Sequence, residues 1–456
     1  MEPTKLETIA RWAGGEITAG DPTCLFTTVC TDSRSLHGGD LFLALRGEKF
    51  DGHAFVAEAV RRGATGAVVE EAPANLPPDF AVVRVPNTLL GLQNLAANYR
   101  RSLSVQIVCI TGSNGKTSTK DLTWSVLRER FQVTKTEGNL NNHIGLPMTM
   151  LRLRSGDRIG VIEIGMNHPG EIAPLAAIAQ PDVAIITNIG VAHIEFMGSR
   201  EAIAEEKGSL AEALPPSGSV VLNADDDFTP KIARRTKADV LLCGLGPRAT
   251  IRATDLSQEV SGTKFLIHAF GRRVEAHLPV LGVHMVRNSL LAVGTGHVFG
   301  MSLEECAAGL GSVQLTKGRL EQKVVRGIQV LDDSYNANPD STKAALLTLS
   351  QISINGRRIA VLGRMGELGQ ESERGHRSVG QCAADLGIDC VITVGADAAL
   401  IAEEAWRGGV AKIVRAADRD EAVNALREYA HAGDIVLVKG SRSEKLEQII
   451  EALAAA

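Results

Sequence analysis

The sequence predicts an α/β protein built from three domains, and three observations indicate that fold class. Short apolar segments rich in β-branched residues alternate with helical segments from residue 105 onward. This alternation is typical of a parallel sheet that helices cover on both faces. A second alternation of the same kind begins near residue 325 and predicts another sheet. The length of 456 residues agrees with three domains of about 150 residues each.

Residues 1–104 form the first expected domain, an N-terminal α/β unit. Its strand-like and helical segments are short: 40–45, 66–70 and 80–85 for the strands, 53–63 and 88–101 for the helices. They mix less regularly than the segments that follow, so the sequence predicts a small domain here.

Residues 105–322 form the expected central domain, of the phosphate-loop ATPase type. Apolar segments predict its parallel strands: 105–110, 159–165, 182–190, 218–224 and 238–246. Residues 250–281 alternate polar and apolar side chains between glycine turns, which predicts a small antiparallel patch. Residues 323–456 form the third expected domain, a Rossmann-like α/β unit with predicted strands at 327–334, 357–363, 390–395 and 434–440.

The composition argues against several classes of protein. With 48 basic and 53 acidic side chains the net charge is −5, which gives no general attraction to nucleic acid or to an anionic membrane. Seven cysteines, an odd number without a CxxC pair, fit a reducing compartment better than a disulfide framework. The N-terminus lacks the apolar segment of a secretion signal, and no run of 18 apolar residues occurs. We therefore expect a soluble cytoplasmic protein without membrane insertion, and we also expect a monomer.

The segment CITGSNGKTSTK, residues 109–120, predicts a phosphate-binding loop between a strand and a helix. Gly112 and Gly115 can adopt the positive φ that turns successive N–H groups toward one anion, and the helix start adds a partial positive charge. Lys116 can reach the β- and γ-phosphates, and the Thr117 hydroxyl can bind Mg²⁺. A glycine turn that merely joins a strand to a helix is the alternative. The strand, the two glycines, Lys-Thr and the helix in register favour the phosphate site.

The loop departs from the common phosphate-loop pattern, because Ile110 stands where that pattern has its first glycine. The short form TGSNGKT resembles the loop of the Mur ligases and of their folylpolyglutamate synthetase relatives. Those enzymes join an amino group to a carboxylate at the expense of ATP. The resemblance implies ATP and Mg²⁺ as cofactors, with ATP bound by the loop residues Gly112, Ser113, Asn114, Gly115, Lys116, Thr117 and Ser118.

Two strand ends supply candidate metal ligands. Glu163 ends an otherwise apolar strand, where a charge is costly unless it is paired or binds a metal. A strand-end residue that faces solvent is the alternative, and we favour a Mg²⁺ ligand. His193 follows the next strand; a lone histidine is usually structural, and no zinc pattern accompanies it. Because open α/β sheets bind ligands at the carboxyl edge of their strands, Glu163, His193 and Thr117 could converge on a metal ion.

Further segments match the Mur pattern. EGNLNNHIGLP, residues 137–147, resembles the loop that contacts the nucleotide-sugar substrate, and it supplies Asn139 and Asn142. GVHMVRNSLLAV places Asn288 one helical turn after His284, and family members use this asparagine near adenine. TKGRLE and LDDSYNANPDS supply candidates for phosphate, ribose and substrate contacts: Arg319, Asp333, Tyr335, Asn336 and Asn338. A turn before a helix, capped by Asp340 or Ser341, is an alternative that can hold at the same time.

The N-terminal segments TDSRS, residues 31–35, and GDLFLALRGEKFDGHAF, residues 39–55, also carry the resemblance. They are similar to the uridine-diphosphate-binding domain of the ligases that extend the muramoyl peptide. The resemblance then implies substrate contacts from Ser33, Arg34, Asp51 and His53. It covers nearly the entire chain.

Within the family, EIGMNHPGEI, DDSYNANPDS and VLGRMGELGQES are closest to the branch that adds D-alanyl-D-alanine to UDP-N-acetylmuramoyl-tripeptide in peptidoglycan precursor synthesis. The sibling branch that adds a diamino acid to the dipeptide usually carries Asn-Pro-Arg, whereas Asn-Pro is followed here by Asp340. Folylpolyglutamate synthetases normally begin near their phosphate loop, so the preceding domain argues against them.

An ATP-driven regulatory switch or transporter subunit is the alternative from another class. It would need a sensor of γ-phosphate loss and a partner surface, and neither is identified in the sequence.

Lys207 lies in AIAEEKGSL, and composition alone favours a solvated helix lysine. The Mur resemblance instead implies a carbamylated lysine beside a second Mg²⁺, and it makes Lys116, Lys207 and His193 the catalytic residues. A divalent ion disfavours a nearby ammonium, a neutral amine can add CO₂, and the carbamate is an anionic oxygen ligand that suits Mg²⁺. Ser209 stands where relatives often have glutamate, which changes a detail of the expected metal surroundings.

Overall fold

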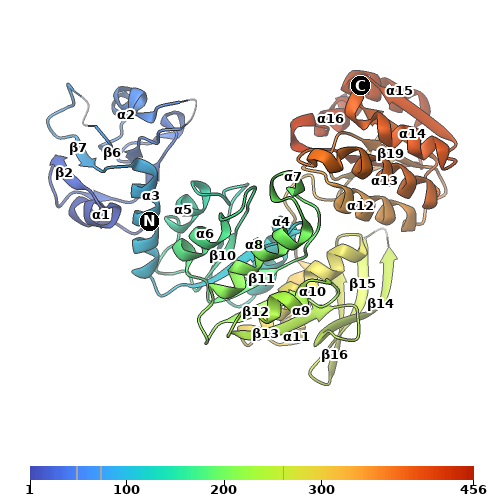
Figure 1. The fold of residues 1–456 in the computed structure, drawn as a ribbon, viewed down its shortest axis with the longest axis horizontal. Helices are drawn as coiled ribbons and strands as arrows, with labels where there is room; N and C mark the ends of the chain where they lie inside the picture. The colour runs from blue at the N-terminus through green and yellow to red at the C-terminus, as the bar shows by residue number, and fades with distance from the viewer. Residues whose placement is uncertain (48–49, 72–73, 260, 456) are drawn as a thin grey trace.

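The computed structural model describes residues 1–47, 50–71, 74–259 and 261–455. Its strands form three main sheets, and a separate two-stranded ribbon pairs β1 (Thr4–Lys5) with β3 (Leu25–Phe26). Figure 1 shows the blue N-terminal part at one end of the molecule, the green and yellow central part in the middle, and the red C-terminal part at the other end. The predicted three-part α/β architecture is confirmed. The division at residues 104/105 and 322/323 stays a prediction.

The N-terminal sheet has five strands, and all neighbouring pairs are parallel except the pair made by its edge strand β2. In spatial order the strands are β2 (Glu16–Ala19), β7 (Ala81–Arg84), β6 (Gly66–Val69), β5 (Leu41–Leu43) and β4 (Val29–Cys30). The helices of this part are α1 (Leu6–Ala13), α2 (Val56–Arg61) and α3 (Thr88–Arg101), with short 3₁₀ turns η1 (Ser33–Ser35) and η2 (Gly52–Phe55). The chain leaves α3 to enter the central sheet, so this helix connects the two parts.

Within the described residues, the central sheet has nine strands. In spatial order they are β16 (Arg272–Leu278), β15 (Gly262–Ala269), β14 (Ile251–Glu259), β13 (Asp239–Gly244), β12 (Ser219–Asn223), β11 (Val183–Ile186), β8 (Gln106–Thr111), β10 (Ile159–Glu163) and β9 (Val133–Lys135). The neighbouring strands from β9 to β13 are parallel, whereas β15 is antiparallel to both of its neighbours, β14 and β16. The antiparallel patch predicted for 250–281 is therefore confirmed, but β14 pairs with β13 and makes the patch an extension of the main sheet.

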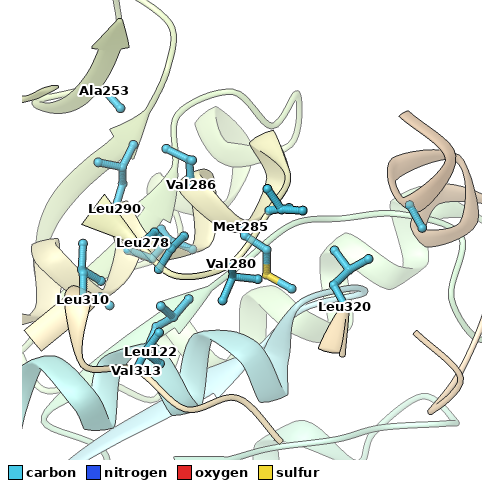
Figure 2. Packing of buried hydrophobic residues seen from close by; sticks show 14 of the residues in the cluster. Leu122, Ala253, Leu278, Val280, Met285, Val286, Leu290, Leu310, Val313 and Leu320 are labelled. Carbon is cyan, nitrogen blue, oxygen red and sulfur yellow. The ribbon is translucent and has the colours of Figure 1, made fainter. Parts of the chain in front are cut away.

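Helices cover both faces of this sheet, as the buried parallel strands require. They are α4 (Lys116–Leu127), α5 (Gly145–Met150), α6 (Ile172–Ala179), α7 (Ile194–Met197), α8 (Arg200–Glu212), α9 (Thr229–Ala233), α10 (Val283–Val298) and α11 (Leu303–Gly311). Helices α4, α10 and α11 pack together over one face, where leucine, valine and methionine side chains form a continuous core (Figure 2). Leu122 of α4 and Leu290 of α10 belong to this core, so the helix that follows the phosphate loop is held rigidly.

The C-terminal sheet has six strands, of which only the edge pair β17–β18 is antiparallel among the described residues. In spatial order they are β17 (Glu321–Val325), β18 (Ile328–Asp332), β22 (Ile435–Lys439), β19 (Arg358–Leu362), β20 (Cys390–Val394) and β21 (Lys412–Ala416). Its elements also include α12 (Pro339–Gln351), α13 (Ser372–Asp385), α14 (Ala399–Arg407), α15 (Arg419–Tyr429) and α16 (Glu447–Ala455), and the turns η3 (Gly369–Glu371), η4 (Ala396–Ala398) and η5 (Arg442–Glu444). The strands that were not predicted from the sequence are β1, β2, β3, β4, β9, β17 and β21.

The topology places one strand, β8, where ligands bind in open α/β sheets. The chain passes from β8 to β9 and β10 on one side and then crosses to β11 on the other. Such a reversal of strand order opens a crevice at the carboxyl ends of the strands. In register, Ile110 lies opposite Glu163 of β10, and Thr111 lies opposite Ile186 of β11. The loop after β8 is therefore flanked by the ends of both neighbouring strands.

Among the helices of the described residues, none combines the length and the apolar character that crossing a membrane requires.

Candidate active site

The predicted phosphate loop connects β8 to α4, and its two glycines are required by the structure. Gly112 has φ +151°, and a Cβ there would lie 1.8 Å from the Thr187 hydroxyl. Gly115 has φ +79° and caps α4, and a Cβ there would lie 2.7 Å from Nδ2 of Asn288. A larger residue fits neither the backbone conformation nor the space. The loop thus presses against the end of β11 and against α10.

Asn188, which follows β11, holds the loop in place. Its carbonyl oxygen accepts from the Ser113 N–H at 2.9 Å, and its side-chain oxygen accepts from the Asn114 N–H at 3.0 Å. Its amide nitrogen donates to the Asn114 carbonyl at 3.0 Å. Asn338, at the start of α12 in the C-terminal part, donates to the Asn114 side chain at 2.7 Å. The loop is therefore fixed from both the central and the C-terminal sheets.

Lys116 and Thr117 open α4 directly after the loop. The Lys116 ammonium donates to the Gly112 carbonyl at 2.8 Å, so the side chain folds back over the loop. Burial lowers the pKa of Lys116, and the Glu163 carboxylate partly opposes this shift. The Thr117 hydroxyl is buried and lies 3.4 Å from Nη2 of Arg319, which enters from the segment between α11 and β17. Two cations thus face one phosphate-binding loop.

Glu163 sits at the end of β10 and is only 3% exposed. Its Oε1 accepts from the Asn141 amide at 2.9 Å, whereas Oε2 has no hydrogen-bond partner among the residues that the structure describes. The burial excludes the solvent-facing interpretation. A buried carboxylate oxygen without a partner is costly unless a cation or a ligand satisfies it.

Lys207 lies on α8 and is 0% exposed, which excludes the solvated helix lysine. Its ammonium nitrogen has no hydrogen-bond partner in the described part of the chain. Burial is the main cause that holds the pKa of Lys207 well below its usual value, and repulsion from Lys116 adds to it. An unpaired buried ammonium beside another cation is unfavourable, so the site favours a neutral amine or an anionic derivative of it.

His193 adopts a positive φ of 63° just before α7. Its Nδ1 lies 2.6 Å from Oε2 of Glu367 in the C-terminal part, and this contact lowers the pKa of Glu367. This contact does not have the geometry of a well-aligned hydrogen bond, because Nδ1 makes no such bond within the described residues. Together with Asn338–Asn114, it joins the C-terminal part to the phosphate-loop edge.

Asp333 follows β18 and forms an ion pair with Lys439 at the end of β22, with 2.5 Å between Oδ2 and Nζ. Its Oδ1 accepts from the Leu320 N–H at 3.2 Å. Burial lowers the pKa of Lys439, and Asp333 opposes that shift. Burial also lowers the pKa of His284 to about 4, so this ring is neutral near pH 7.

These residues border a single cleft of about 1520 Å³. The side chains that line it come from all three parts of the chain, and Gln93 on helix α3 represents the N-terminal part. The predicted site residues found there are Ser113, Asn114, Gly115, Lys116, Thr117, Ser118, Asn139, Asn142, Glu163, His193, Asn288, Arg319, Asp333, Tyr335, Asn336 and Asn338. Gly112 and Lys207 are buried and do not line this cleft.

The structure does not bring the predicted N-terminal residues into this cleft. The Arg34 guanidinium donates two hydrogen bonds to Asp32, at 2.9 and 2.8 Å, beside Ser33 in the turn η1. Asp51 lies 2.6 Å from Nδ1 of His53 and 3.1 Å from Nε of Arg46. Ser33, Arg34, Asp51 and His53 thus lie on the N-terminal part, at a second location.

Several residues of the site were not among the predicted ones. Glu367 pairs with His193, Lys439 pairs with Asp333, and Asn141 holds Glu163. The sequence could have identified Lys439, because a charged residue ends an apolar strand there, as it does at Glu163. The cap of α12 is Asn338 rather than Asp340 or Ser341, and Pro339 at the first helical position explains why.

Chemically, the cleft can hold a polyphosphate at the loop and act on a group placed between the loop and the C-terminal sheet. Within the described residues, no group of three or more His, Cys, Asp or Glu side chains converges as a complete metal site. The predicted metal set contains only Glu163 and His193 of those types, with a hydroxyl and a lysine as the other members.

Three family models match consecutive parts of the chain. The Mur ligase family catalytic domain matches residues 25–100, the Mur ligase middle domain matches 110–296, and the Mur ligase glutamate ligase domain matches 318–442. The boundaries between these matches fall close to the changes from one sheet to the next.

Relatives and solved structures match over nearly the full length. UDP-N-acetylmuramoyl-tripeptide–D-alanyl-D-alanine ligase of Bacillus subtilis is 38% identical over 93% of this chain and 92% of its own, and that of Escherichia coli is 35% identical over 96% of each. A crystal structure of MurF from Acinetobacter baumannii aligns with a TM-score of 0.91, 33% identity and full coverage of both chains. MurF from Thermotoga maritima in complex with ADP aligns with a TM-score of 0.84 and 28% identity, over 94% of this chain and 97% of its own. On this agreement of sequence, fold and phosphate loop, the chain belongs to the Mur ligase family.

Proposed function

We propose that this protein is an ATP-dependent ligase that adds D-alanyl-D-alanine to UDP-N-acetylmuramoyl-tripeptide and releases ADP and phosphate. The observation that carries the proposal is one cleft in which a phosphate-binding loop faces side chains from all three parts of the chain. The names of the Bacillus subtilis and Escherichia coli relatives support the choice of substrates. The ADP complex of the Thermotoga maritima neighbour supports a nucleotide as the ligand of the loop.

The two separate locations fit a long substrate. The uridine diphosphate would bind on the N-terminal part, near Ser33, Arg34, Asp51 and His53. The peptide would extend along the cleft past Asn139 and Asn142, so that its terminal carboxylate reaches the phosphate loop. D-Alanyl-D-alanine would enter from the C-terminal wall, which carries Tyr335, Asn336 and Asn338.

The chemistry requires an activated carboxylate, because a free carboxylate is a poor electrophile. The carboxylate of the tripeptide attacks the γ-phosphorus of ATP, ADP leaves, and an acyl phosphate results. The amine of the dipeptide then attacks the acyl carbon, phosphate leaves, and the amine loses a proton. Lys116 and Arg319 face the loop and would offset charge on the transferring phosphoryl group, where positioning and electrostatics dominate catalysis.

Mg²⁺ is the metal cofactor that this site would hold. Two unsatisfied buried atoms fit it: Oε2 of Glu163, and the nitrogen of Lys207, which as a carbamate would present anionic oxygens. Thr117 and His193 complete the proposed set. When bound, Mg²⁺ would neutralise charge on the phosphates of the nucleotide.

Contacts between the C-terminal part and the loop edge would shield the acyl phosphate from water. Asn338 bonds to Asn114, Asp340 accepts from the Val191 N–H at 3.0 Å, and Glu367 pairs with His193. The same contacts bring the C-terminal wall over the phosphate loop, and excluding water prevents hydrolysis of a reactive intermediate.

All seven cysteines are unpaired, which supports a reaction in the cytoplasm.

The proposal is tested by measuring ADP release against a panel of uridine-diphosphate-muramoyl peptides and amino acids or dipeptides. We expect release only when the muramoyl tripeptide and D-alanyl-D-alanine are both present. Release with the muramoyl dipeptide and a diamino acid would assign the chain to the sibling activity. Hydrolysis that a partner protein stimulates without either substrate would favour an ATP-driven switch.

A further inference from the structure

The linker between α11 and β17, residues 312–320, is tied to the phosphate-loop helix by a buried carboxylate. Asp121 on α4 is 0% exposed. Its Oδ2 accepts from both the backbone N–H of Thr316, at 2.9 Å, and the Thr316 hydroxyl, at 2.8 Å. Its Oδ1 accepts from Lys135 at 2.6 Å, and Lys120 lies 3.5 Å away. Both carboxylate oxygens therefore have partners: Oδ2 binds the linker, and Oδ1 faces the two lysines.

The linker follows one face of α4 back toward the phosphate loop. Asp121 lies one helical turn after Thr117, so both side chains are on the same face. Thr316 contacts Asp121, and Arg319, three residues later, lies 3.4 Å from the Thr117 hydroxyl. Val313 and Leu320, near the two ends of the linker, belong to the same apolar cluster as Leu122 of α4 (Figure 2).

The far end of the linker is held by the C-terminal part instead. The Leu320 N–H donates to Asp333, and the Gly318 carbonyl accepts from the Tyr335 N–H at 3.2 Å. Gly318 has φ +71° and Leu320 has φ +52°, and a positive φ is strained for a leucine. The sharp turn on both sides of Arg319 lies between an anchor on the central part and an anchor on the C-terminal part.

Arg319 has an unused donor at this turn. Its guanidinium lies 4.2 Å from the centre of the Tyr335 ring, and its buried Nε makes no hydrogen bond to the residues that the structure describes. Ser312 at the start of the linker contacts the Ser125 hydroxyl at 3.2 Å, and Val313 packs on the α4 core. The contact between Asp121 and Thr316 is the one of these ties to α4 that lies nearest to Arg319 in sequence.

We propose that Asp121 is a positioning residue that fixes the linker on α4, so that Arg319 points at the phosphate loop. The inference rests on the proposed function, because it assigns to Arg319 a role in phosphoryl transfer. Asp121 itself touches no reacting atom; it acts through Thr316 and the linker.

The test is a double-mutant cycle with Asp121→Asn and Arg319→Ala. An amide has one acceptor oxygen, so Asn at this position can serve the linker or Lys135 but not both. We expect Asp121→Asn to lower kcat about tenfold, with KM for ATP changed less than about threefold, because the adenosine contacts are untouched. When Asp121→Asn is added to Arg319→Ala, kcat should fall by less than about twofold relative to Arg319→Ala alone, because the guanidinium that Asp121 positions is already absent.

Asp157→Asn is the matched control. Asp157 is also buried and also accepts from a hydroxyl, of Thr134, and from a backbone N–H, of Arg154, but it does not contact the linker. It should leave kcat near wild type. If Asp121→Asn does not fold, Thr316→Val replaces it in the cycle, since valine removes only the hydroxyl bond.

A second measurement is independent of the ligase reaction. Hydrogen exchange of the Thr316 amide should be about tenfold faster in Asp121→Asn, and unchanged in Asp157→Asn. If the panel of substrates gave no ligase activity, the proposed function would fail while this measurement still decided whether Asp121 holds the linker. The inference is overturned if Asp121→Asn lowers kcat by the same factor in both backgrounds, or if Thr316 exchanges at the wild-type rate.

Discussion

Lys116→Ala is expected to lower kcat by about 10²-fold or more, the size of effect that follows the loss of one preorganised charge-stabilising donor. Lys116 folds over the loop and donates to the Gly112 carbonyl at 2.8 Å, so its ammonium lies against the loop at which we propose that the phosphoryl group is transferred. Burial lowers the pKa of Lys116 and Glu163 opposes this shift, and bound phosphates would add further anionic partners for the ammonium. The measurement is steady-state kcat with both proposed substrates saturating.

Two further variants separate charge from packing. Lys116→Met keeps most of the side-chain volume and should be as inactive as the alanine variant, because the cation is lost in both. Lys237→Ala removes an exposed lysine from the central part and should behave as wild type. Near-normal turnover of Lys116→Ala, with an unchanged midpoint of thermal unfolding, would show that the loop lysine has no role in phosphoryl transfer.

Lys207→Ala is expected to be nearly inactive, and a short carboxylic acid such as acetate is expected to restore part of the activity. The lysine is fully buried and unpaired, and burial favours the neutral amine that can add CO₂. In the alanine variant, acetate can occupy the vacated space and present the oxygens that the carbamate would have presented. The measurement is ADP release at increasing acetate concentration.

Lys207→Met is the matched control for this rescue. It fills the space without an amine, so it should be inactive and should not respond to acetate. Wild-type activity of Lys207→Ala in the absence of acid would contradict the carbamate. Mass spectrometry under native conditions would show the intact wild-type chain heavier by one CO₂, and the two variants without this addition.

The phosphate loop could be predicted from the sequence because its signal is local. A buried strand, Gly112, Gly115 and a helix that begins with Lys116 stand within one short segment, and each residue type is dictated by backbone conformation or by contact with an anion. The structure adds the reason for the glycines, since Thr187 and Asn288 leave no room for a Cβ.

The pairs that complete the site could not be predicted, because they join distant parts of the chain. Glu367 and His193 lie 174 positions apart in sequence, and Lys439 and Asp333 lie 106 apart. No periodicity links such residues; they meet only because the C-terminal sheet packs beside the edge that carries the phosphate loop. The prediction from composition that Lys207 is solvated was also wrong. Helix α8, which carries this residue, packs against α6 and the central sheet, and Lys207 is buried.

The sequence also predicted most of the buried strands of the fold but missed several of its edge strands. Strands with continuous apolar runs, such as β8 and β20, were identified because both of their faces are buried. Strand β21, with the sequence KIVRA, carries two charges and is partly exposed at the edge of its sheet, so its pattern was too weak to be recognised. Strand β14 pairs with β13 over only two residues, which explains why the antiparallel patch looked separate.

The central claim is that ATP activates the tripeptide carboxylate at this phosphate loop before the dipeptide amine attacks. Its most direct test uses muramoyl tripeptide labelled with ¹⁸O in its terminal carboxylate, together with ATP and D-alanyl-D-alanine, and measures the label in the released phosphate by mass spectrometry. Attack of the carboxylate on the γ-phosphorus predicts one ¹⁸O in the phosphate for every peptide bond formed. Phosphate that carries no label, with all the oxygen label left in the peptide or in water, would contradict the account.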